Sequence, residues 1–64
     1  MGGINMKIVK RCAYMINNDE LIMQDLNKVW GKIMCDYLNE HNDNNLVFYQ
    51  LVSDEFKLKV RDKE

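Results

Sequence analysis

The chain has 64 residues, of which 47% are hydrophobic and 30% are charged, and its formal net charge is −1. This composition excludes a disordered chain, and the length indicates one small domain over residues 1–64. No apolar run approaches the roughly 20 residues that cross a bilayer, and residues 1–5 lack the regions of a signal peptide, so we expect a cytoplasmic protein without membrane contact. The eight asparagines are typical of a low-GC coding source, such as a bacterium or a phage.

Residues 6–16 fit two periodic patterns. Read as a strand, alternate residues from Met6 to Ile16 share one apolar face, interrupted by Lys10. Read as a helix, the same segment has an apolar stripe that includes Ile8 and Cys12. Periodicity alone does not choose between the two, and we favour the strand because the C-terminal part of the chain also predicts a sheet.

Residues 19–41 are predicted to form one long amphipathic helix, because their apolar residues are spaced by threes and fours. These apolar residues are Ile22, Met23, Leu26, Val29, Trp30, Ile33, Met34, Tyr37 and Leu38. Asn17 is the expected N-cap, with Glu20 completing a capping box. The helix is expected to end near His41, before the turn-forming residues 42–45.

Residues 46–51 and 56–61 alternate in polarity and predict a hairpin in which Leu51 faces Phe56 and Val47 faces Val60. The predicted fold is a small α+β domain of order β-α-β-β, with the long helix packed on an antiparallel sheet that contains the hairpin. An all-α bundle is the alternative. The expected core is formed by Ile22, Leu26, Val29, Trp30, Ile33, Tyr37, Val47, Tyr49, Leu51, Phe56, Leu58 and Val60.

Residues that could carry chemistry are few and isolated. His41 is the single histidine, Ser53 is the single serine, and neither belongs to a catalytic or metal-binding motif. Cys12 and Cys35 lack metal-ligand spacing and are interpreted as buried free thiols. We therefore expect no enzymatic activity, no cofactor and no metal site.

Gly31 lies in the middle of the predicted helix, where glycine costs about 1 kcal/mol relative to alanine. Cys35 follows one turn later, and two small residues one turn apart let another backbone approach closely. The sequence therefore predicts a small regulator or adaptor that binds protein through this helix surface, either as a homodimer or with another partner. The predicted contact residues are Asn27, Gly31, Met34, Cys35 and Leu38.

A nucleic-acid-binding function is the alternative. Residues 19–43 carry six acids against two lysines, whereas the predicted strands carry basic residues and no acid. Basic residues around an exposed aromatic ring on a sheet can bind single-stranded nucleic acid through charge and base stacking. The predicted residues of this surface are Phe48, Lys57, Lys59 and Arg61.

Overall fold

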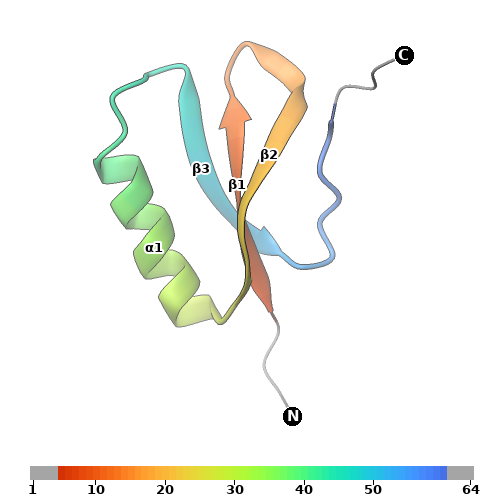
Figure 1. The fold of residues 1–64 in the computed structure, drawn as a ribbon, viewed down its shortest axis with the longest axis vertical. Helices are drawn as coiled ribbons and strands as arrows, with labels where there is room; N and C mark the ends of the chain where they lie inside the picture. The colour runs from red at the N-terminus through yellow and green to blue at the C-terminus, as the bar shows by residue number, and fades with distance from the viewer. Residues whose placement is uncertain (1–4, 61–64) are drawn as a thin grey trace.

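The computed structural model describes residues 5–60, except for the side chains of residues 15–17. Its elements are β1 (Met6–Cys12), β2 (Met15–Leu26), α1 (Lys28–Glu40) and β3 (Val47–Ser53). The strands form one antiparallel sheet in the order β2-β1-β3, and α1 packs against it beside β3 (Figure 1). The α+β class, with one helix on an antiparallel sheet, is confirmed, and the all-α alternative is not supported.

The order of the elements differs from the prediction, because the hairpin lies at the N-terminal end of the chain. β1 and β2 form it, so that the chain runs β-β-α-β. The second strand predicted for the C-terminal hairpin is wrong. Residues 56–59 form no strand, and Val60 makes only an isolated bridge with Asn18. The helix already lies along the free edge of β3 on which that strand was expected to pair.

The N-terminal part of the predicted helix is instead the long strand β2, and irregular pairing explains the difference. Met23 pairs with Ile8 and Leu26 with Met6, so a spacing of three residues on β2 matches a spacing of two on β1. An extra residue of this kind is a β-bulge, and Asp25 within it has a φ of 60°. The bulge gives a strand the three-residue apolar spacing of a helix, which misled the sequence prediction.

The core surrounds the central strand β1, and its pattern confirms the strand interpretation of the first segment as far as Cys12, whereas residues 13–14 form the turn to β2. Ile8 and Val9 are completely buried, although they point to opposite faces of the sheet. Ile8 pairs with Leu51 on β3, and Val9 pairs with Gln50. Because both faces of β1 are covered, each of these neighbouring residues can be apolar.

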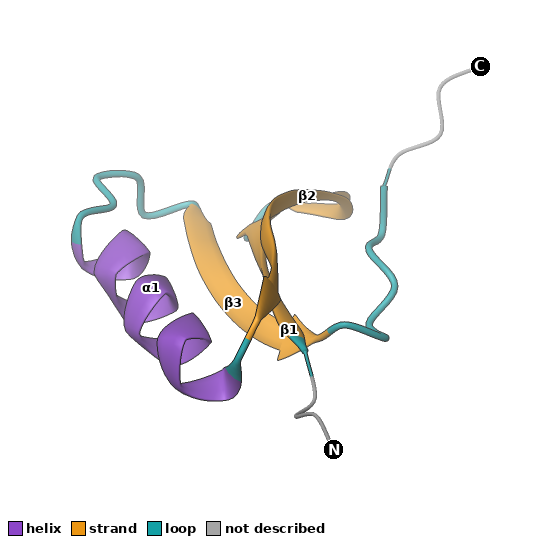
Figure 2. Ribbon diagram, turned by 60° about the horizontal axis from the view of Figure 1, so that its bottom comes forward, coloured by secondary structure: helices purple, strands orange, loops and turns teal. Residues whose placement is uncertain are grey.

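The outer edge of β3 lies beside α1 and the loop that follows it (Figures 1 and 2), and asparagine side chains from these two segments close this edge. The Tyr49 N–H donates to Asn39 Oδ1 at 2.8 Å, and Asn39 Nδ2 donates back to the Tyr49 carbonyl at 2.9 Å. Asn42 Nδ2 donates to the Val47 carbonyl at 2.7 Å. These bonds satisfy backbone groups that an exposed edge strand would offer to another chain.

Residues 54–60 lie next to β2, at the edge of the sheet opposite to α1 (Figure 1). Asp19 on β2 is 7% exposed and fastens this segment to the sheet. Its carboxylate accepts hydrogen bonds from Arg11 Nε at 3.3 Å and from the Lys59 N–H at 3.0 Å. The Arg11 guanidinium also lies 5.5 Å from the centre of the Phe56 ring, which brings the segment over the second face of β1.

Candidate functional site

The helix begins at an asparagine cap that the sequence prediction placed elsewhere. Asn27 is the N-cap, and its Oδ1 accepts the Trp30 N–H at 2.8 Å. The predicted cap at Asn17 and its capping box with Glu20 are wrong, because both residues lie in β2. The predicted end is confirmed, since His41 is the C-cap.

The side of α1 that faces the sheet carries small side chains. Gly31 and Cys35 are its buried residues. A Cβ placed on Gly31 would lie 2.7 Å from Leu51 Cδ1, so the missing side chain is what allows helix and sheet to come this close. Cys35 Sγ donates to the Tyr49 carbonyl at 3.4 Å. The close approach predicted from these small residues exists, but the approaching element is the protein's own β3.

Four of the large apolar residues of α1 consequently point away from the sheet. Val29, Trp30, Ile33 and Tyr37 are 68%, 59%, 50% and 55% exposed. We call these four residues the outer face of α1. Their assignment to the core was wrong because a single helix can present only one side to a small sheet, and the small residues occupy that side.

The residues predicted to contact a partner are largely used within the fold. Asn27 caps the helix, Gly31 and Cys35 pack on the sheet, and Met34 and Leu38 are half-buried. Gly31 and Cys35 are therefore not accessible to a second copy. The outer face of α1 lies on the opposite side of the same helix and offers a larger apolar surface than the predicted one.

Charged residues form a row beside the outer face. Lys28, Lys32, Asp36 and Glu40 follow one another at intervals of four residues, and Lys32 Nζ lies 3.6 Å from Asp36 Oδ2. At the far end of the outer face, the rings of Tyr37 and His41 are in contact, with centroids 4.3 Å apart. The outer face is thus an apolar stripe with a charged border and aromatic groups at both ends.

The basic surface predicted for nucleic acid does not form as a sheet face. Phe48 is exposed on β3, and Lys57 and Lys59 are exposed on the irregular segment rather than on a strand. Arg61 lies outside the described residues. Arg11, which pairs with Phe48 across the sheet, is bound to Asp19 and to Gln50 Oε1 at 2.9 Å. The charge of this arginine is largely compensated within the fold.

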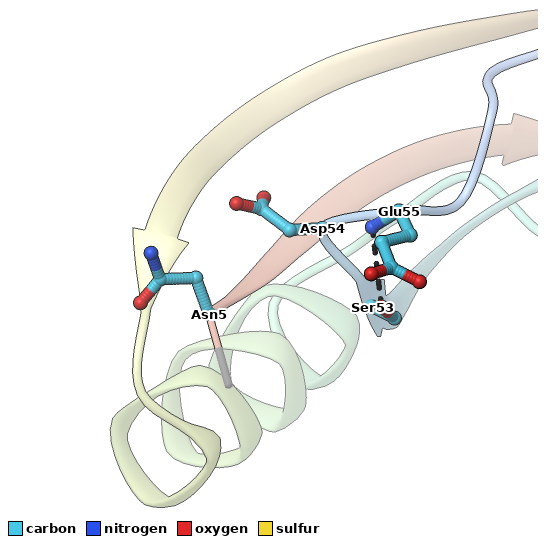
Figure 3. Close-up of a pocket in the computed structure, with 4 residues that line it drawn as sticks. All are labelled: Asn5, Ser53, Asp54 and Glu55. Atoms are coloured by element: carbon cyan, nitrogen blue, oxygen red, sulfur yellow. Dashed lines mark hydrogen bonds between the residues drawn. The ribbon is translucent and has the colours of Figure 1, made fainter. Parts of the chain in front are cut away.

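A hollow of about 500 Å³ lies where β1 begins and β3 ends (Figure 3). It is lined by Asn5, Ser53, Asp54 and Glu55, and the Glu55 N–H donates to Ser53 Oγ at 3.1 Å within it. Among residues 5–60, no group of three potential metal ligands is found. These contacts are those of a turn that ends β3, and they favour no particular chemistry.

The two cysteines are free, with Cys12 half-buried and Cys35 buried. Burial raises the pKa of the Cys35 thiol, and the negative charge of Asp36 raises it further. A thiol in this state is a poor nucleophile, because the thiolate is the reactive form. This supports the interpretation of Cys35 as a packing residue.

Comparison of the chain with protein-family models, with curated proteins and with solved structures found no match. Within the described part of the chain, no helix has the length and apolar character needed to span a membrane. The outer face of α1 was missed at the sequence level because its residues were assigned to the core. Gly31 was the residue that could have revealed the outer face. A glycine in a helix usually lies on the side that packs closely against another element, so the large apolar residues on the opposite side are the exposed ones.

Proposed function

We propose that this protein is a small non-enzymatic binding module, a regulator or adaptor that recognises protein through the outer face of α1. The observation that supports the proposal is the exposure of four large apolar side chains along one side of a helix of 13 residues. Trp and Tyr dominate the binding energy of many protein interfaces, because they bury a large area at a low entropic cost. An amphipathic helix of this kind docks through residues spaced by threes and fours, as Trp30, Ile33 and Tyr37 are.

The alternative function, nucleic-acid binding, has weaker support. It requires a basic surface with an exposed aromatic ring, and the strand expected to carry Lys57 and Lys59 does not form. The outer face of α1 is bordered by Asp36 and Glu40, which would repel phosphate groups. An apolar face with charges of both signs at its border fits a protein partner better.

The experiment is affinity capture of the tagged protein from its native host, with the captured proteins quantified for three versions of the chain. The wild type is compared with Ile33→Asp, which puts a charge at the centre of the outer face. Tyr14→Asp is the matched control, because Tyr14 is a large apolar residue with 62% exposure in the turn between β1 and β2. A partner that Ile33→Asp loses and Tyr14→Asp retains would support the proposal. Partners retained by both variants would contradict it.

A further inference from the structure

We propose that the outer face of α1 binds the outer face of a second copy of this chain, with the two helices antiparallel about a two-fold axis near Ile33. This inference rests on the proposed function and names its partner. Three observations on the described residues carry it: the order of the charges along α1, their relation to the helix dipole, and the size of the core.

The charges beside the outer face are divided by sign. Lys28 and Lys32 occupy the N-terminal half of the row, and Asp36 and Glu40 occupy the C-terminal half. A two-fold axis perpendicular to the helices places the two rows on the same side of the contact and reverses one against the other. The lysine half of each row then lies at the same level along the helix axis as the acidic half of the other row. Parallel helices related by a two-fold axis along their length would instead place the two rows on opposite sides of the contact, where they could not pair, so the order of charges favours the antiparallel arrangement.

The same charges are unfavourable for the helix on its own. The N-terminus of a helix favours acids and the C-terminus favours bases, yet α1 has no acidic residue in its first turn and no basic residue in its last turn. In the antiparallel pair, Lys28 lies near the C-terminal end of the second helix and Glu40 near its N-terminal end. The second copy thus accounts for a charge order that the single helix does not explain.

The described core is small for an independent domain, since Ile8 and Val9 are its only large side chains with full burial. Domains of this size often depend on oligomerisation for stability. A helix of 13 residues is about 20 Å long, so its outer face alone is smaller than the roughly 800 Å² per partner of a standard interface. We therefore expect a dimer that dissociates in the micromolar range and a melting temperature that rises with protein concentration.

The test uses two variants with opposite helix charge, measured by sedimentation equilibrium at low salt over a micromolar concentration series. The acidic variant combines Lys28→Glu and Lys32→Glu, and the basic variant combines Asp36→Lys and Glu40→Lys. In both variants the new charges agree with the helix dipole, but the Lys32–Asp36 pair is lost and four like charges follow one another at intervals of four residues. Circular dichroism and urea denaturation therefore verify that both variants are folded before their dimerisation is measured. We expect each variant alone to dimerise about tenfold or more weakly than the wild type, because its charged rows repel. An equimolar mixture is expected to form a heterodimer with near wild-type affinity.

The orientation is tested by disulfide formation in a Cys12→Ala background, where Val29→Cys and Tyr37→Cys are placed on separate chains and mixed. Antiparallel helices predict cross-linking between the two different variants, whereas cross-linking of Val29→Cys with itself would overturn the arrangement. A wild type that is monomeric throughout the series, or charge variants that dimerise as the wild type does, would overturn the second copy as partner. Loss of captured protein in Ile33→Asp alone would then still support the proposed function, so the two failures are distinguishable.

Discussion

Asp19 and Lys59 hold each other by two hydrogen bonds, although forty residues separate them in the chain. The Asp19 N–H donates to the Lys59 carbonyl at 2.8 Å, and the Lys59 N–H donates to Asp19 Oδ2 at 3.0 Å. Asp19 Oδ1 is bound to Arg11 at the same time. One buried carboxylate therefore connects β1, β2 and the C-terminal segment.

Replacing this carboxylate is expected to be severe. Asp19→Ala leaves the Arg11 guanidinium and the Lys59 N–H without their acceptor in a site where the Asp19 side chain is 2% exposed. Breaking a buried ion pair by removing one partner costs about 3–5 kcal/mol of folding stability. We expect a loss of about 3 kcal/mol, at the lower end of this range, because the Arg11 side chain is partly exposed to solvent and retains its hydrogen bond to Gln50. Urea denaturation measures the loss.

The neighbouring residue provides the control for this prediction. Glu20 is 65% exposed, and its carboxylate lies 3.9 Å from Lys10 Nζ in a surface ion pair. Glu20→Ala should change the free energy of unfolding by less than about 1 kcal/mol, because such pairs contribute little. Equal losses for the two variants would show that Asp19 does not fasten the C-terminal segment.

Asn39 is expected to protect the edge of β3 from pairing with other chains. Asn39→Ala removes both hydrogen bonds to the Tyr49 backbone and should cost about 1–2 kcal/mol, because the site is partly exposed. Light scattering at raised temperature should show faster aggregation, since the freed edge can accept another strand.

A matched substitution separates the two bonds that Asn39 makes. Asn39→Asp retains the acceptor for the Tyr49 N–H and loses the donor to the Tyr49 carbonyl, so we expect it to be destabilised as well. Asp43→Ala, in the exposed loop between α1 and β3, should behave as the wild type does. Stability and aggregation rates unchanged in both Asn39 variants would contradict the role of this side chain.

The sequence predicted the class of the fold better than its order. Apolar periodicity located a helix that ends at His41 and a strand that begins near Leu46, because each element repeats its apolar residues with the period of its own geometry. It failed at residues 19–26, where a bulge at Asp25 gives a strand the spacing of a helix. Periodicity also reports that a helix has two unlike sides without saying which one packs, so the small side containing Gly31 was assigned to a partner.

Gly31 is expected to tolerate only a small addition. Gly31→Arg cannot fit between α1 and Leu51 and should prevent folding, seen as loss of the circular dichroism signal of the native state. In Gly31→Ala the new Cβ requires Leu51 Cδ1 to move, while alanine stabilises the helix by about 1 kcal/mol, so the net change should be within about 1 kcal/mol. A folded Gly31→Arg protein would place the packing side of α1 elsewhere.

Stability is expected to fall at alkaline pH through Cys35. Its thiol pKa in the folded protein is raised above the ordinary value of 9.0, chiefly by burial and further by the charge of Asp36. As pH rises through about 9, the unfolded chain releases this proton before the folded chain does, so unfolding becomes more favourable. The part of the folding stability that depends on the protonated Cys35 thiol is fully present below pH 9 and is lost as pH rises through the pKa of the folded protein. Urea midpoints of the wild type should therefore drop relative to those of Cys35→Ala above pH 9, and parallel curves for the two proteins would contradict the shift.

In Cys12→Ala, where Cys35 is the one remaining thiol, alkylation of Cys35 by iodoacetamide at pH 8 should be much slower in the folded protein than in the protein unfolded by urea.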